Sequence, residues 1–209
     1  TVANRSAKFT FSGVSSHAAS APDRGRSALD AVEAMNFMVN LLREHVPTST
    51  RLHYVITNGG SAPNVVPNTA QSFYYVRHPS ETTLREIWDR VMATAEAAAV
   101  GTGTSMSYEI IHGNYSVLPN DTLAKVMHAK LSSVGGVEYS EADEVFAAEI
   151  SKTLPTGAYT QGRAAEIKPF ETGQRGNGST DVGDVSWTVP TVGMSTATWV
   201  PGTGAHTWQ

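Results

Sequence analysis

Cysteine is absent from the 209 residues of this chain, which excludes disulfide bonds and thiolate metal ligands. Charge is also scarce, because charged residues make up 16% of the chain and the net charge is -4. An acidic chain without clustered Lys and Arg is not expected to bind nucleic acid. No apolar run reaches the roughly 20 residues that span a bilayer, and the first residues do not resemble a signal peptide. The sequence therefore predicts a soluble, cytoplasmic protein with no nucleic-acid or membrane partner.

Several catalytic motifs are missing as well. The sequence has no His-Glu-x-x-His or His-x-Asp metal motif, no Gly-x-Ser-x-Gly elbow and no phosphate-binding Walker loop. Gly101-Thr102-Gly103 follows a predicted helix rather than a strand, so it is not expected to bind a dinucleotide. Hydrophobic residues, in contrast, make up 40% of the chain, which is enough to bury a core.

The first 115 residues alternate between strand and helix patterns. Four segments alternate polar and apolar residues, as half-buried strands do, and two segments carry apolar residues at helical spacings of three and four. The predicted strands are 7–13, 51–57, 71–77 and 104–111, and the predicted helices begin near Ser27 and Ser80. This βαββαβ order predicts an α+β fold, in which a ferredoxin-like, four-stranded antiparallel sheet has both helices on one face.

Residues 116–209 have a different character. Helices are predicted over 121–134 and 140–154, and a short strand over 188–194. Ser140 and Asp143 have the spacing of a capping box, and residues 155–177 have no period and indicate a loop. Because these elements are too few for a complete domain, we expect a first domain over 1–115 and an incomplete α/β segment over 116–209.

Four polar residues stand in loops or at a strand end, where a side chain can reach a ligand. His17 lies in a small-residue loop between a strand and a helix, and His206 follows a flexible Pro- and Gly-containing segment. Each is either a solvated side chain or a functional imidazole. Asn64 either forms an Asx turn or reaches a substrate. Arg77 is either a solvated strand-end charge or a bidentate clamp for a carboxylate.

Two acidic residues, Asp181 and Asp184, lie in a turn that is rich in Gly and Ser. They either cap a short helix that starts near Asp181 or hold a ligand group, and capping is the simpler interpretation. The other histidines carry no motif around them, and we interpret them as structural or surface residues: His45, His53, His78, His112 and His128.

The order of these residues resembles a known family. The run Phe11-Ser12-Gly13-Val14-Ser15-Ser16-His17-Ala18-Ala19 is similar to the start of the lid domain of dinuclear zinc amidohydrolases. These enzymes are the relatives of aminoacylase, carboxypeptidase G and succinyl-diaminopimelate desuccinylase. The run Ala62-Pro63-Asn64-Val65-Val66-Pro67 resembles the family's Asn-Val-Ile-Pro loop, and Gly178-Ser179-Thr180-Asp181 stands in the family's order.

The resemblance implies a role for each position. It implies that residues 1–115 are a lid through which two subunits pair, and that His17 stabilises the oxyanion in the partner subunit's active site. It further implies that His206 is a metal ligand and that four residues bind the substrate: Asn64, Arg77, Ser179 and Thr180. Family members cleave an amide with water activated by two Zn²⁺ or Mn²⁺ ions, with a Glu as general base.

The chain departs from the family pattern in one respect. The family's His-x-Asp, bridging Asp and Glu-Glu precede the lid, and none of them is present. We therefore expect a fragment, the lid plus a C-terminal catalytic segment, that is inactive alone and binds no metal tightly. The expected whole is a homodimer, with or without a second related subunit, that hydrolyses small N-acyl amino acids such as p-aminobenzoyl-glutamate. The alternative is a non-catalytic dimerisation or small-ligand-binding module.

Overall fold

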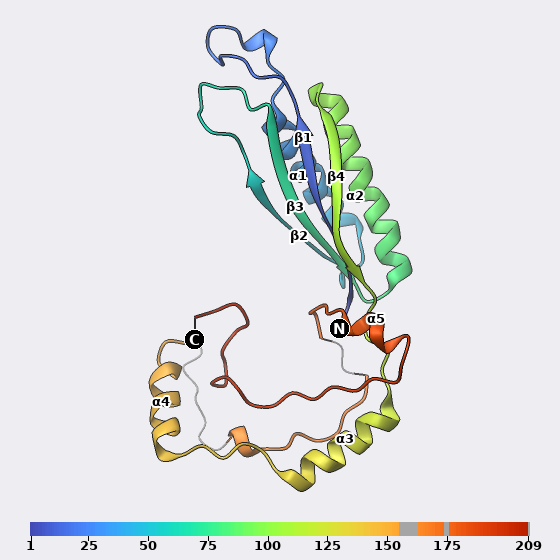
Figure 1. Cartoon of the computed structure of the whole chain (residues 1–209), viewed down its shortest axis with the longest axis vertical. Coiled ribbons are helices and arrows are strands. Elements are labelled where there is room, and N and C mark those ends of the chain that lie inside the picture. The colour runs from blue at the N-terminus through green and yellow to red at the C-terminus, as the bar shows by residue number, and fades with distance from the viewer. Residues whose placement is uncertain (155–162, 174–175, 209) are drawn as a thin grey trace. The chain divides into compact units, whose positions relative to one another are not determined.

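The computed structural model describes residues 1–154, 163–173 and 176–208. The chain divides into two compact units (Figure 1): Thr1–Leu118 with Arg175–Thr188, and Pro119–Gln174 with Val189–Gln209. The first unit contains the predicted 1–115 domain and adds a segment from late in the chain. Within the described part of the chain, no helix is both long and apolar enough to cross a bilayer.

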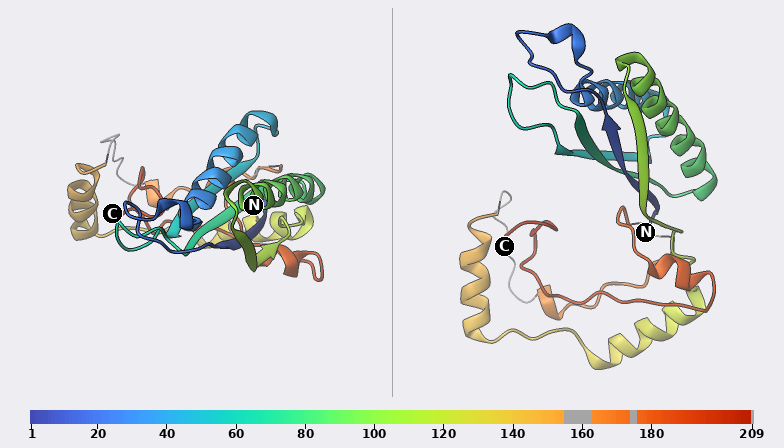
Figure 2. Two further views of the ribbon diagram at one scale, coloured as in Figure 1. Left: turned by 90° about the horizontal axis from the view of Figure 1, so that it is seen from above. Right: turned by 45° about the horizontal axis from the view of Figure 1, so that its top comes forward.

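The first unit is a sheet covered by helices on one side. Its main elements are β1 (Ala3–Ser12), α1 (Ala28–Leu42), β2 (Arg51–Asn58), β3 (Thr69–His78), α2 (Glu81–Thr102) and β4 (Ser105–Asn114). All strand pairs are antiparallel, in the order β2-β3-β1-β4. Both helices pack on the same face of the sheet (Figure 1 and Figure 2). The predicted βαββαβ fold is therefore confirmed. The other face of the sheet, which we call the open face, carries no helix of the described residues of the first unit.

The central strand β1 begins earlier than its alternating pattern predicts. Asn4 pairs with Arg77 of β3 on one side and with Asn114 of β4 on the other. Asn4 and Ser6 lie on the open face, yet they are only 2% and 0% exposed. A strand that is paired on both sides continues through polar residues, since its backbone groups are satisfied by the ladder.

The core of the first unit lies between the sheet and the helices. Phe9 of β1 packs edge-on against Tyr74 of β3, with 5.7 Å between ring centroids, and lies 6.0 Å from the ring of Trp88 of α2. Asn36 of α1 reaches into this layer, and its Oδ1 accepts hydrogen bonds from the hydroxyls of Tyr74 and Ser72. Burial raises the pKa of the Tyr74 hydroxyl above its ordinary value, so it remains a donor at physiological pH.

The second unit consists of helices and extended segments. The helix α3 (Asp121–Val134) has the predicted bounds, and α4 (Glu141–Ser151) begins at the predicted capping box of Ser140 and Asp143. The predicted strand over 188–194 is wrong, because these residues pair with no strand in the described part of the chain. An alternating segment becomes a strand only where a neighbouring strand completes its ladder.

Candidate functional site

His17 and Asn64 lie on two loops that pair with each other at one end of the sheet. The backbone N–H of Ala18 donates a hydrogen bond to the carbonyl oxygen of Asn64 over 3.0 Å. His17 and Val65 form an isolated antiparallel bridge in the same place. The two residues that the family resemblance couples are therefore neighbours in space, although they are far apart in the sequence.

A glycine positions the His17 loop. After β1, Val14 and Arg26 exchange two backbone hydrogen bonds of 2.8 and 2.9 Å, which fold the loop back toward the start of α1. A Cβ atom at Gly13 would lie 1.9 Å from the carbonyl oxygen of Arg26, so no other residue fits without a shift of the backbone. The close approach of the two segments therefore explains the Gly that precedes the loop.

The imidazole of His17 is held by its own loop. Its Nδ1 accepts hydrogen bonds from the backbone N–H groups of Ala19 and Ser20, both over 3.2 Å. A ring nitrogen that accepts from an N–H carries no proton, so the neutral ring has its proton on Nε2. Because the side chain is exposed, Nε2–H is available as a donor to a ligand. This geometry suits a hydrogen bond to a developing oxyanion.

Asn64 is exposed, and the next residue in its loop, Val65, lines a cavity. The side-chain amide of Asn64 forms no hydrogen bond within the described residues, so the Asx-turn interpretation is wrong. The Asx turn in this loop belongs to Asn58, whose Oδ1 accepts a hydrogen bond from the N–H of Gly60 over 3.1 Å. The cavity, of about 210 Å³, has these polar lining residues: Ser15, Asn58, Ser61, Asn68 and Thr69. The Asn64 amide is thus free to meet a ligand.

Arg77 lies at the opposite end of the sheet. The Asn64 loop enters β3 at Thr69, and Arg77 is the last residue but one of that strand, so roughly 26 Å of extended chain separates the two ends. The guanidinium of Arg77 lies 5.3 Å from the ring centre of Tyr75, and its Nε is buried without a partner among the described residues. One copy of the chain therefore does not bring Arg77 to His17 and Asn64.

Ser179 and Thr180 come to the same end of the sheet as Arg77. The N–H of Val2, just before β1, donates to the carbonyl oxygen of Gly178 over 3.0 Å. At this point β1 pairs with the last residues of β3. The hydroxyl of Ser179 is buried and has no partner in the described part of the chain. The residues expected to bind substrate are therefore divided between the two ends of one sheet.

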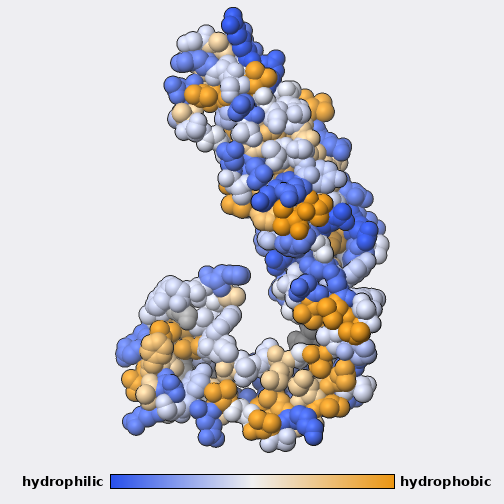
Figure 3. All heavy atoms as spheres, in the orientation of Figure 1, coloured by the Kyte–Doolittle hydropathy of each residue, from blue (hydrophilic) through white to orange (hydrophobic). Residues whose placement is uncertain are grey.

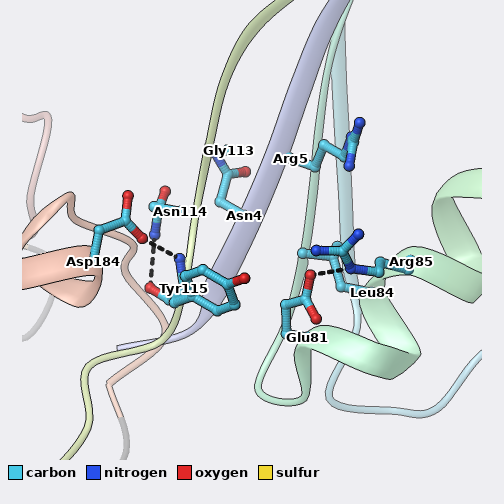
Figure 4. A pocket seen from close by; sticks show the side chains of 9 residues that line it. All are labelled: Asn4, Arg5, Glu81, Leu84, Arg85, Gly113, Asn114, Tyr115 and Asp184. Carbon is cyan, nitrogen blue, oxygen red and sulfur yellow. Dashed lines mark hydrogen bonds and ion pairs between the residues drawn. The ribbon is translucent and has the colours of Figure 1, made fainter. Parts of the chain in front are cut away.

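The two acidic residues do not cap a helix. The helix α5 (Val182–Ser186) begins after Asp181, whose side chain makes no capping hydrogen bond, so the capping interpretation is wrong. Asp184 instead accepts a hydrogen bond from the backbone N–H of Tyr115 over 2.8 Å (Figure 4), which ties α5 to the end of β4. A cavity of about 190 Å³ lies here, and its charged and amide lining residues are Asn4, Arg5, Glu81, Arg85, Asn114 and Asp184.

His206 lies in the second unit, in a turn where its own backbone is left-handed (φ 64°). Across the described ranges, no three His, Asp or Glu side chains lie close enough together to hold a metal ion. A zinc site in a protein needs three or four such ligands. The described residues therefore do not fit a dinuclear centre by themselves, and His206 remains a single candidate ligand.

Two residues beside Arg77 are not found from the sequence pattern. The register of β2 and β3 pairs Arg51 with Arg77 and His53 with Tyr75, all on the open face. Partial burial, followed by the positive charges of Arg77, Arg43 and Arg51, lowers the pKa of His53 below its ordinary 6.5. The alternation of β2 puts Arg51 and His53 on one face, but only the pairing with β3 brings them to Arg77.

Comparison with known sequences relates the first unit to a known domain. The peptidase dimerisation domain of the M20 family matches residues 4–103. The chain is 38% identical over 234 residues to one of the subunits of p-aminobenzoyl-glutamate hydrolase of Escherichia coli (strain K12), covering 100% of this chain and 49% of that protein. It is 30% identical to Xaa-Arg dipeptidase of Mus musculus, covering 90% of this chain and 38% of that protein. The chain spans about half the length, or less, of these relatives.

Solved structures share the fold. The aminobenzoyl-glutamate utilization protein from Klebsiella pneumoniae aligns with a TM-score of 0.53 at 22% identity, over 66% of this chain and 35% of that one. AtUAH, solved in complex with (S)-hydroxyglycine, aligns with a TM-score of 0.56 at 18% identity, over 63% of this chain and 32% of that one. At such identities the likeness establishes the fold alone.

Proposed function

We propose that this chain, whose residues 4–103 match the peptidase dimerisation domain of the M20 family, supplies the lid of a metal-dependent amidohydrolase of that family. The proposed reaction is hydrolysis of the amide bond of a small N-acyl amino acid such as p-aminobenzoyl-glutamate. The name of the relative with 38% identity, which is part of a p-aminobenzoyl-glutamate hydrolase, supports this substrate. In this proposal residues 1–115 act as the lid and residues 116–209 as the C-terminal part of the catalytic domain.

The proposed homodimer forms along β2. This strand is at the edge of the sheet, where backbone groups can pair with a second copy, although the carbonyl of Leu52 already accepts a hydrogen bond from Arg43. Apolar side chains are exposed on β2 and on α1, which borders it through the hydrogen bond between Asn40 and Tyr54. They are Val55, Ile56, Phe37 and Leu41, which are 55%, 41%, 64% and 51% exposed. Pairing along this edge would satisfy the backbone groups and bury apolar area at the same time.

A dimer of this kind completes the site. The strand β2 runs from Arg51, which pairs with Arg77, toward Asn58 at the loop end of the sheet. When two copies of β2 pair antiparallel about a twofold axis, the Arg51 end of one copy lies beside the Asn58 end of the other. His17 and Asn64 of one protomer then share an end with Arg77 of the partner subunit. The placement of these residues at opposite ends of one sheet is the observation that carries the proposal.

Each residue has a proposed role in that composite site. The Nε2–H of His17 donates to the oxygen that becomes negative when water adds to the amide carbonyl, and the Asn64 amide orients the substrate beside it. The guanidinium of Arg77 binds the carboxylate of the amino-acid part, with the hydroxyls of Ser179 and Thr180 at the same end. The chemistry that the family's metal ions supply, activation of water, requires ligands beyond His206.

A second, related chain is a further proposed partner. The relative with 38% identity is one of two named subunits of its hydrolase, and the other subunit is 23% identical over 61% of this chain. A related chain that carries the same lid could pair along the same β2 edge. This partner would be supported if the chain co-purified with a tagged second chain and if Val55→Pro, a change in the edge strand, abolished the co-purification.

Complementation between two inactive variants tests the composite site. His17→Ala and Arg77→Ala, each in the full-length protein, should lower kcat/KM for an N-acyl-glutamate by about 100-fold or more. Co-expressed, they should recover roughly a quarter of wild-type activity, because half of the dimers are mixed and each mixed dimer has one intact site. Arg24→Ala, an exposed arginine outside the site, is the control. Absence of recovery with both variants folded and dimeric would refute the shared site.

A further inference from the structure

Two arginines lie directly opposite each other on the open face of the sheet. Arg51 of β2 and Arg77 of β3 are partners in the antiparallel register, so their Cα atoms are about 5 Å apart. Like charges in this position are destabilising, and sheets normally avoid them. The pair therefore calls for a counter-charge, and none is found among its neighbours in the described ranges: Asn4, His53 and Tyr75 carry no negative charge at neutral pH.

Both guanidiniums have unused hydrogen-bonding capacity. The Nε of Arg77 is buried and has no partner among the described residues. Arg51 uses Nη1 to donate to the carbonyl oxygens of Thr48 and Thr50, each over 2.8 Å, which anchors its planar group at the end of the strand. An anchored guanidinium loses little further entropy when it binds an anion, and the remaining N–H groups have the fork geometry of a carboxylate.

The positive field of the pair is felt by a neighbouring side chain. His53 follows on the same face of β2, and the charges of Arg77, Arg43 and Arg51 contribute to the lowering of its pKa after partial burial. A neutral His53 leaves the site to the two arginines and can accept or donate one hydrogen bond. Two adjacent cations with an aromatic wall at Tyr75 and no carboxylate of their own suit a small dianion better than a monoanion.

We infer that Arg51 is a specificity-determining residue that binds a second carboxylate of the substrate, next to the one bound by Arg77. The substrate class is then the N-acyl derivatives of acidic amino acids, whose two carboxylates are separated by a short aliphatic chain. This inference rests on the proposed function, because it takes Arg77 as the residue that binds the carboxylate of the amino-acid part. It adds that neutral and basic amino-acid parts are discriminated against at Arg51.

Binding of simple carboxylates to the chain tests this site without catalysis. The isotopically labelled chain is titrated with glutarate, a dicarboxylate, and with butyrate, a monocarboxylate of similar length, and the amide NMR shifts around Arg77 are followed. We expect glutarate to bind at least about tenfold more tightly, as one additional charge-assisted pair provides. Arg51→Gln should abolish this difference by weakening glutarate alone. Arg77→Gln should weaken both ligands, and the exposed control Arg24→Gln neither.

The outcomes separate this inference from the proposed function. Equal affinities for glutarate and butyrate in the wild-type chain, with both lost in Arg77→Gln, would overturn the role of Arg51 and leave that of Arg77 intact. Unchanged glutarate binding in Arg51→Gln would overturn it in the same way. Shifts that persist in Arg77→Gln, or no shifts near Arg77 with either ligand, would overturn both the inference and the proposed carboxylate site.

Discussion

The two units of this chain use similar sequence patterns and bury them to different degrees. In the first unit, Phe9, Phe11, Met35 and Tyr74 are completely buried between the sheet and its helices. In the second unit, α3 has no buried residue, although its apolar residues recur at helical spacings, and Val126 on that helix is 54% exposed. Figure 3 shows apolar side chains gathered at the surface over α3 and α4.

The difference between the two units shows that forming a helix and burying its apolar face are separate requirements. A periodic sequence with a good cap indicates where a helix begins and which of its faces is apolar, as α3 and α4 illustrate, because caps and local contacts act within a few residues. Burial also requires an apolar surface that faces the helix, and in the first unit the sheet provides it. The first unit is therefore expected to carry the measurable stability of the chain, and the following changes test that expectation.

The largest effect is expected from the core of the first unit. Phe9→Ala removes a ring that packs on both Tyr74 and Trp88, and it should lower the free energy of unfolding by about 3–5 kcal/mol. The matched change in the second unit, Phe146→Ala, should alter it by less than about 0.5 kcal/mol because that side chain is 67% exposed. Urea unfolding followed by far-ultraviolet circular dichroism measures both. Similar losses in the two variants would contradict the comparison.

An intermediate effect is expected from the helix caps. Ser80 caps α2 and Ser140 caps α4 through the same type of bond, and either Ala variant should cost about 1 kcal/mol locally. The consequences should differ, because α2 is held by buried residues such as Trp88, whereas α4 buries only Ala147 and Ser151. Amide hydrogen exchange should accelerate along much of α4 in Ser140→Ala but only in the first turn of α2 in Ser80→Ala. If exchange accelerated over the same number of turns in α2 and α4, the expected difference between the two helices would be contradicted.

The smallest effect concerns pH, and the two units should respond in different ranges. The pKa of His53 is lowered from 6.5 in the folded state, so the unfolded chain takes up the proton first and stability falls as pH drops through and below 6.5. In the second unit, hydrogen bonds from Ser140 lower the pKa of Asp143 from 3.8, so its contribution is lost only in stronger acid. His53→Gln should flatten the first response and leave the second. Thermal unfolding measured from pH 2 to pH 8 covers both ranges. An unchanged pH profile in His53→Gln would exclude His53 as the source of the first response.

The sequence is informative about the candidate site where the signal is local. The small-residue loop around His17 and the Asn64 loop stand out as places where a side chain can be presented, and their family resemblance links them. Arg51 and the role of Asp184 are not visible in this way. Arg51 becomes significant only through its register with Arg77, and Asp184 only through its bond to Tyr115 at the end of β4. Both depend on contacts between segments that are distant along the chain.

By itself, the sequence determines the periodicity, the caps and the order of the elements in this protein, because each depends on interactions within one or two turns or one strand. Ser27, Ser80 and Ser140 all cap helices as their local patterns predict. Only the tertiary structure decides which residues share a site. Strand pairing fixes the register, and register puts His17 with Asn64 at one end of the sheet and Arg51 with Arg77 at the other. Pairing joins segments that are distant along the chain, and the register that buries the apolar face of each strand is chosen along the whole ladder rather than within one segment.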